Sequence, residues 1–241
     1  MRQKATYLFL MLAALLSGCN GGRSLAAYWD GVDLHVTEDN YSAVQDLFAG
    51  FAERLVTAPE KEASEALNGM IDRIQDDEVD YIIYSQWMEY AFHNYFSPCR
   101  NYGLFNAAVN RFAADGILSS EDVERLQKMA GQDSLNRPGG PCTLPAGLEP
   151  KGSTLYLVLN LDCRTCLQSL EALAGSHPEA DHLALCFGYN PLPSIKGWKY
   201  LKPEGMKDFF DLDAAPFWFL TADDGTVLQP YSAIFPDTDK I

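Results

Sequence analysis

The sequence predicts an α+β protein in which an α-helical N-terminal domain precedes a small mixed sheet flanked by helices. From residue 40 to about residue 131, apolar residues recur three and four positions apart, as on one face of a helix. Residues 133–153 are rich in proline and glycine and show no period, which is typical of a linker. Beyond them, short apolar runs alternate with helical segments, which favours a sheet covered by helices.

Five helices are expected in the N-terminal domain. The first follows Asn40, the second opens at a capping box over residues 57–60, and the last runs from residue 120 to its end near Gly131. The third and fourth cover residues 79–95 and 102–114. The third is rich in aromatic residues, which are more typical of a packing face than of a ligand groove. These residues are Tyr81, Tyr84, Trp87, Tyr90, Phe92 and Tyr95, followed by Phe96.

Strands and helices alternate in the C-terminal half. The order strand, helix, strand, helix and hairpin predicts a mixed sheet. The expected strands are residues 154–159, 183–189, 217–221 and 226–228, and the expected helices are residues 163–174 and 203–210.

The N-terminus resembles a bacterial lipoprotein signal. Arg2 and Lys4 precede an apolar run at residues 5–16, which is shorter than the ~20 residues of a membrane-spanning helix. Leu16-Ser17-Gly18-Cys19 is similar to the lipobox, where the chain is cut before a cysteine whose thiol carries a diacylglycerol. The resemblance implies a signal peptide at residues 1–18 and lipidation of Cys19, and a plain secretory signal is the alternative.

This signal implies a protein outside the cytoplasm, held to a membrane by its lipid anchor and a tether at residues 19–27. Asn20 stands in place of the aspartate associated with inner-membrane retention, which favours the periplasmic face of the outer membrane.

The formal net charge of the chain is −15, and removal of residues 1–18, with two basic and no acidic side chains, makes it −17. So acidic a surface disfavours nucleic-acid binding.

Cys163 and Cys166 form a C-x-x-C pair where a predicted strand ends and a helix begins. The N–H groups and dipole of a helix N-terminus stabilise a thiolate. We therefore expect Cys163 to be the nucleophile and Cys166, one turn further on, to resolve the mixed disulfide. Arg164 would favour the thiolate of Cys163, whereas Asp162 would oppose it.

Other uses of the pair fit the sequence less well. A structural zinc site needs four ligands, and the sequence has neither a second C-x-x-C nor histidines at zinc spacing. A c-type haem site requires histidine after the second cysteine, where Leu167 stands. No metal and no cofactor are therefore expected. A structural disulfide without exchange activity stays open as the alternative.

Together with the segment DLDAAPFWFLTADDGTVL, residues 211–228, the pair resembles the thioredoxin fold. In that family a cis-proline loop before a β-hairpin faces the cysteines. The resemblance implies a thioredoxin-like domain at residues 154–241, a cis bond at Ala215-Pro216, and a backbone edge at Ala215 that guides an extended substrate. The sequence departs from thioredoxin at Asp162, where thioredoxin has tryptophan, and at Arg164-Thr165, where it has Gly-Pro.

The predicted α-helical domain, residues 28–132, carries a second resemblance, which extends to about residue 140. The stretches YWDGVDLHVTED, YFSPCRNYGLF and LNRPGGPCT look like an uncharacterised helical domain that precedes thioredoxin-like modules in Gram-negative lipoproteins. That domain brings no known activity.

Three further cysteines stand apart from the pair. Cys186 lies in an apolar run and is expected to be a buried, inert thiol. Cys99 and Cys142 are expected in loops, where a disulfide between them would tie the two domains together, although connectivity does not follow from sequence. With Cys19 lipidated, five cysteines remain, so at least one thiol is free or pairs between chains.

The expected function is that of a membrane-anchored thiol:disulfide oxidoreductase. Its partners would be protein thiols and disulfides outside the cytoplasm, together with a redox partner protein. The alternative is a non-catalytic binding or scaffold lipoprotein with a thioredoxin fold and a structural disulfide.

Overall fold

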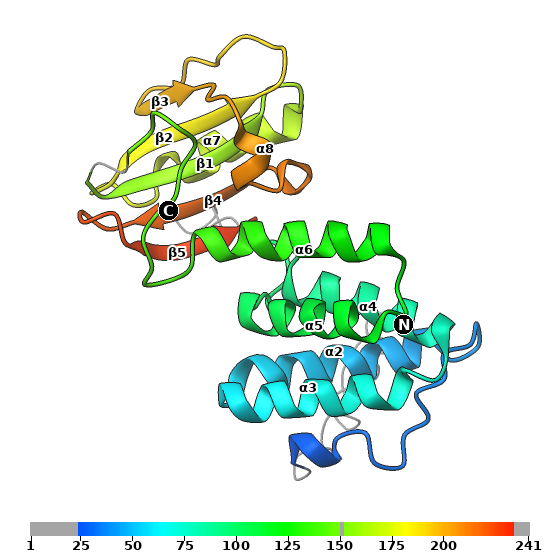
Figure 1. Ribbon diagram of the computed structural model, residues 1–241. Helices are drawn as coiled ribbons and strands as arrows, with labels where there is room; N and C mark the ends of the chain where they lie inside the picture. The colour runs from blue at the N-terminus through cyan, green and yellow to red at the C-terminus, as the bar shows by residue number, and fades with distance from the viewer. Residues whose placement is uncertain (1–23, 150–151, 234–241) are drawn as a thin grey trace, which may run out of the picture.

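The computed structural model describes residues 24–149 and 152–233. The regular elements of its N-terminal part are all helical (Figure 1). Within these ranges, no helix combines the length and the apolar character needed to cross a membrane. The helical elements are η2 (Leu25–Ala27), α2 (Tyr41–Thr57), α3 (Glu60–Ile74), α4 (Glu78–Phe92), α5 (Tyr102–Asp115) and α6 (Ser120–Leu135).

One apolar core joins these helices, and it uses the faces that the helical spacing predicts. On α4 the predicted packing face is confirmed, because Tyr81, Tyr84, Trp87 and Phe92 are buried. Phe48 of α2 meets the Tyr84 ring edge-on at a centroid distance of 6.0 Å, an arrangement that aromatic pairs favour. Two members of the aromatic set differ, since the side chains of Tyr90 and Phe96 are exposed.

The predicted capping box at residues 57–60 is wrong. Thr57 is the last residue of α2, and its hydroxyl donates back to the carbonyl oxygens of Glu53 and Arg54, at 3.2 and 3.0 Å. Pro59 occupies the N-cap position of α3 without a side-chain cap. A threonine hydroxyl that bonds to the preceding turn is no longer available to the following helix.

The C-terminal part is a five-stranded mixed sheet in the order β3-β2-β1-β4-β5. Strands β1, β2 and β3 are parallel, whereas β4 is antiparallel to β1 and to β5. The predicted α+β class is therefore confirmed. The elements are β1 (Thr154–Asn160), α7 (Arg164–Ala174), β2 (Asp181–Phe187), β3 (Trp198–Leu201), α8 (Met206–Phe209), η3 (Leu212–Ala214), β4 (Phe217–Thr221) and β5 (Val227–Ser232).

Strand β1 divides the sheet between two cores, because successive side chains point to opposite faces. Leu155, Leu157 and Leu159 belong to one core with Leu170 and Leu173 of α7. The intervening Tyr156 and Val158 belong to the other core, with α8 and the aromatic residues of β4 and β5. The pattern fixes α7, and with it the cysteine pair, on one face of the sheet.

Strand β3 is not among the predicted elements, and its composition explains why. It has four residues, of which only Trp198 is buried, so it shows neither a long apolar run nor a clear alternation.

Strand β5 extends beyond the predicted 226–228 to Ser232 and contains Pro230. It is an edge strand of the sheet, where a missing N–H is tolerated.

The segment expected to be a linker is partly built into both of its neighbours. The predicted end of α6 at Gly131 is wrong, since the helix continues to Leu135. Gln132 stabilises this last turn by donating to the carbonyl oxygens of Lys207 and Phe210, at 2.8 and 3.1 Å. Further on, residues 139–142 pair with the backbone of residues 225–227 at the start of β5.

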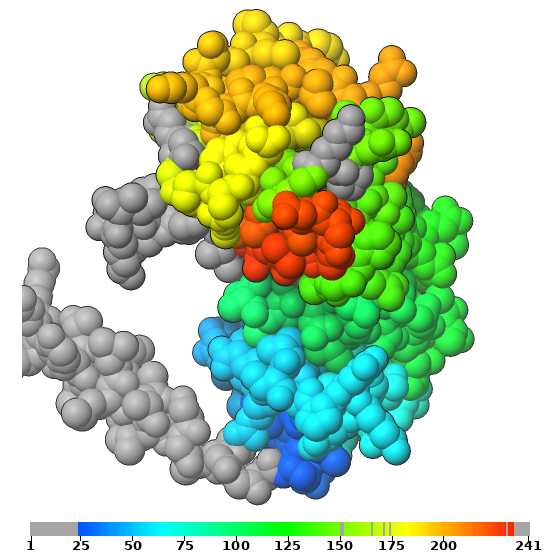
Figure 2. Space-filling model, turned by 90° about the vertical axis from the view of Figure 1, so that its left-hand side faces the viewer, coloured from blue at the N-terminus to red at the C-terminus, as the bar shows by residue number. Residues whose placement is uncertain are grey.

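The helical part packs directly against the sheet. Tyr95, which follows α4, is buried, and its ring centroid lies 4.7 Å from that of Phe217 and 5.4 Å from that of Tyr231. The carbonyl oxygen of Tyr95 accepts a hydrogen bond from Ala233 at 3.0 Å. In Figure 2, β5 (red) lies next to the green residues of the helical part. Residues distant in sequence thus form a shared aromatic interface.

Replacement of Tyr95 tests this interface. We expect Tyr95→Ala to lower the free energy of unfolding by about 3–5 kcal/mol, the usual cost of removing a buried aromatic ring. Urea denaturation followed by tryptophan fluorescence measures it. Tyr95→Phe is the matched control: the Tyr95 hydroxyl is buried without a hydrogen-bond partner among the described residues, so its loss should cost little. Equal stability of Tyr95→Ala and wild type would refute the interface.

Candidate functional site

Cys163 occupies the N-cap position of α7, directly after β1 and its turn. Its Sγ accepts a hydrogen bond from the backbone N–H of Cys166 at 3.3 Å. The side chain is partly exposed, whereas Cys166 is 1% exposed. The N–H groups of a first helical turn favour a negatively charged sulfur at this position. Cys163 is therefore the sulfur that a partner reaches first.

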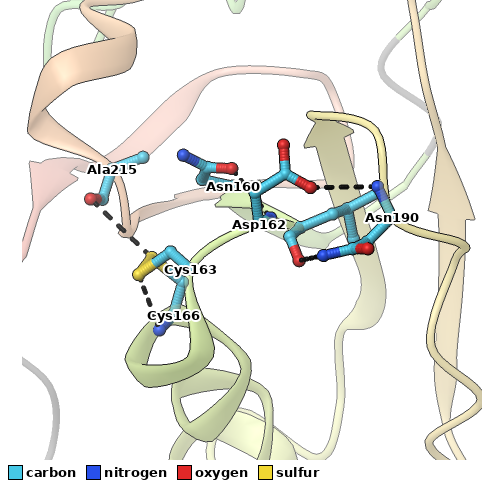
Figure 3. Close-up of a disulfide and its surroundings, with 7 residues drawn as sticks. Asn160, Asp162, Cys163, Cys166, Asn190 and Ala215 are labelled. Carbon is cyan, nitrogen blue, oxygen red and sulfur yellow. Dashed lines mark hydrogen bonds between the residues drawn. A yellow bond between two sulfur atoms is a disulfide. The ribbon is translucent and has the colours of Figure 1, made fainter.

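Cys163 and Cys166 form a disulfide, with their Cα atoms 5.3 Å apart. The Ala215-Pro216 bond is cis, which confirms the expectation for this loop. The Sγ of Cys166 lies 4.0 Å from the carbonyl oxygen of Ala215 (Figure 3). The fold therefore brings the C-x-x-C pair and the cis-proline loop together, although about fifty residues separate them in the sequence.

The Asp162 carboxylate is directed toward Asn190 and away from the sulfur atoms (Figure 3). It accepts backbone N–H hydrogen bonds from Tyr189 and Asn190 at 3.0 Å each. These hydrogen bonds lower the pKa of Asp162. Asp162 therefore acts here as an anchor for the loop after β2, a role that sequence reasoning missed.

Arg164, the other residue expected to tune Cys163, is exposed in the first turn of α7. Across the described ranges its side chain forms no ion pair.

Gly188 permits the close approach of this loop to Asp162. Its φ is +101°, and a Cβ at this position would lie 2.8 Å from Oδ2 of Asp162 and 3.1 Å from Oδ1 of Asn160. Only glycine adopts such a φ without strain. Asn160 further orders the turn before Cys163, since its Oδ1 accepts the backbone N–H of Asp162 at 2.9 Å.

A buried polar cluster contacts the segment that precedes the cis-proline loop, and no sequence motif marks it. His93 directs Nδ1 to Asp133 at 2.8 Å and Nε2 to Asp211 at 3.4 Å. Arg100 donates to the second oxygen of Asp133 at 2.6 Å and to the carbonyl oxygen of Tyr231 at 3.2 Å. Asp211 caps η3, which leads into Ala215. The cluster thus connects the helical part to the loop.

Charge in this cluster shifts the titration of its members. Burial alone lowers the pKa of His93, but the hydrogen bonds and charges of Asp133 and Asp211 outweigh it and raise that pKa to about 9. The same hydrogen bond from His93 lowers the pKa of Asp211. A ring that faces a carboxylate at each nitrogen is best satisfied as imidazolium, because only that form donates from both.

The three other cysteines within the described ranges, Cys99, Cys142 and Cys186, are free thiols. Cys99 and Cys142 are not joined to each other, so the disulfide suggested for them is not formed. Burial raises the pKa of Cys142 to about 12 and that of Cys186 to about 11, which makes both poor nucleophiles. Cys186 is buried, as expected. The predicted lipidation site, Cys19, lies outside the described residues.

One group within the described ranges has metal-ligand chemistry: His35, Asp77 and Asp80, with ligand atoms within 4.8 Å of one another. Asp80 already accepts hydrogen bonds from the backbone of Val36 and from the His35 ring, at 2.8 and 2.9 Å. These contacts attach the segment before α2 to α4. This structural role explains the presence of the three side chains without a metal ion.

Comparison with known proteins agrees with this architecture. A solved structure described as a thioredoxin-like protein from Bacteroides caccae ATCC 43185 matches with a TM-score of 0.68 and 20% sequence identity, over 87% of each chain. The fold is thioredoxin-like. No protein-family model and no curated protein matches the sequence.

The His93 cluster predicts a pH dependence of stability. The folded-state pKa of about 9 exceeds the ordinary 6.5, so the stabilisation is complete below pH 6.5 and is lost as the pH rises through 9. We expect about 3 kcal/mol of unfolding free energy to disappear over this window. Urea titrations at pH 6 and 9.5 measure it, and His93→Gln is the control for other titrating groups. An NMR titration that places the pKa of His93 below 6.5 would contradict the assignment.

Proposed function

We propose that this protein is a thiol:disulfide oxidoreductase that exchanges disulfides with protein partners through Cys163 and Cys166. One observation carries the proposal: the partly exposed Cys163, at the N-cap of α7, is bonded to the buried Cys166 beside the cis-Pro216 loop. The thioredoxin-like fold supports a redox role for such a pair. Pro216 and the backbone of Ala215 would guide the substrate chain.

In the reducing direction, the Cys163 thiolate attacks one sulfur of a substrate disulfide. An S–S bond forms between Cys163 and that sulfur, the substrate S–S bond breaks, and the leaving thiolate takes a proton from water. Deprotonated Cys166 then attacks Sγ of Cys163 and releases the second substrate sulfur, which is also protonated. Two electrons pass to the substrate, and a dithiol redox partner protein restores them. The reverse sequence oxidises a substrate dithiol.

Replacement of each cysteine should impair disulfide exchange at a different step. We expect Cys163→Ser to abolish reduction of insulin in the presence of dithiothreitol, because the accessible nucleophile is lost. Cys166→Ser should instead accumulate mixed disulfides, visible on non-reducing gels, because nothing resolves them. Cys142→Ser is the matched control and should retain activity. A wild-type protein without exchange activity, with a pKa of Cys163 at or above ~8.5 by alkylation rate, would favour the non-catalytic scaffold.

We further propose that the protein is lipid-anchored through Cys19 at the periplasmic face of the outer membrane. The order of basic, apolar and small residues before Cys19 supports this location. Labelled palmitate should enter the wild-type protein and not Cys19→Ala, which should leave the membrane fraction. Asn20→Asp should move the labelled protein to the inner membrane on a density gradient. Equal labelling of the wild type and Cys19→Ala would refute the anchor.

A further inference from the structure

A groove of about 430 Å³ lies where the helical part meets the cis-proline loop. One side is formed by α4, the turn after it and α6, and the other by the segment that leads into Ala215. The residues that matter here are Tyr90, Phe96, Met129, Asp211, Asp213 and Ala214.

Exposed aromatic side chains line the helical side of the groove. Tyr90 is 65% exposed and Phe96 56% exposed, although most other aromatic residues of this segment are buried. Neither belongs to one of the three apolar cores. Exposed aromatic rings that line a groove are typical of a surface that binds a partner.

The groove adjoins the segment that leads into the cysteine site. Ala214 lines it, and the next residue is Ala215, whose carbonyl oxygen lies 4.0 Å from Sγ of Cys166. An extended chain bonded to Cys163 and running along Ala215 would therefore enter this groove with the residues next to its cysteine. Because each extended residue spans ~3.3 Å, the residues concerned are those within about two positions of that cysteine.

The charge of the groove is negative. Its lining includes the carboxylates of Glu89, Asp211 and Asp213 and the ring of His93. Glu89 is paired with Arg125 and Asp211 with His93, whereas Asp213 is exposed. The exposed Asp213 lies two residues before Ala215 and complements a cation on a bound chain.

We propose that this groove binds the substrate segment that adjoins the reacting cysteine, and that it selects an aromatic or aliphatic side chain close to a lysine or arginine. The proposal rests on the proposed disulfide exchange and names its substrate class. The helical part then supplies half of the substrate-binding surface, with Tyr90 and Phe96 as specificity-determining residues and Asp213 as the partner of the cation.

The test uses the reduced full-length protein and synthetic peptides whose single cysteine carries glutathione as a mixed disulfide. Within two residues of that cysteine, one peptide has Phe and Lys, a second Phe and Glu, and a third only Gly and Ser. Hydroxyethyl disulfide serves as a small substrate that needs no groove. Tyr90→Ala, Phe96→Ala and Asp213→Asn are compared with Val79→Ala, an equally exposed apolar residue at the start of α4.

We expect the Phe-Lys peptide to react about tenfold faster than the Gly-Ser peptide, a typical contribution of one aromatic anchor. Tyr90→Ala and Phe96→Ala should remove most of this preference. Asp213→Asn should reduce the difference in reaction rate between the Phe-Lys and Phe-Glu peptides. Val79→Ala should behave as wild type, and hydroxyethyl disulfide should react equally with every variant. Peptide rates that do not depend on Tyr90 and Phe96 would overturn the proposal.

A second measurement separates this proposal from the proposed function. Fluorescence anisotropy of a labelled Phe-Lys peptide with serine in place of cysteine reports binding without chemistry. Weaker binding by Phe96→Ala than by Val79→Ala supports the groove, and equal binding refutes it. A wild-type protein that does not react with hydroxyethyl disulfide refutes the proposed exchange activity, whatever the anisotropy shows.

Discussion

The arrangement of the two parts of the chain depends on the buried carboxylate of Asp133. A buried charge is costly unless it is paired and hydrogen-bonded, and removal of a partner typically costs about 3–5 kcal/mol. Asp133 receives Arg100 on one oxygen and His93 on the other. Both cations also reach the C-terminal part, Arg100 at the carbonyl oxygen of Tyr231 and His93 at Asp211. Satisfying one carboxylate thus connects the helices to the sheet.

This connection bears on the cysteine site because Asp211 stands just before the cis-proline loop. The loop is held from the helical side through Asp211, while the cysteines are held from the sheet side through α7. The alternation along β1 supplies the second constraint, since Leu155, Leu157 and Leu159 all contact the α7 side. The sulfur atoms and the Ala215 backbone therefore meet between two rigid supports, and rigid supports favour a defined site.

Local patterns predicted the elements that bury a continuous face. The helices before residue 130 and strands β1 and β4 lie where apolar spacing places them, because burial of that face stabilises them. The errors at the helix ends and at β3 have separate physical causes. Gly131 does not end α6, because Gln132 donates hydrogen bonds to carbonyl oxygens of the C-terminal part. Thr57 does not cap α3, because its hydroxyl donates to the carbonyl oxygen of Glu53 in its own helix. Strand β3 has too little buried surface to leave a pattern.

The sequence by itself determined the C-x-x-C pair, because two cysteines at this spacing can be read directly, and its resemblance to the thioredoxin fold implied the thioredoxin-like class and the cis-proline loop. Only the tertiary structure decided how these features are surrounded. Asp162 binds the loop after β2, His93 lies between two carboxylates, and Tyr90 with Phe96 forms a groove beside Ala214. In each case the partners are distant in the chain, and only packing of the helices against the sheet brings them into contact.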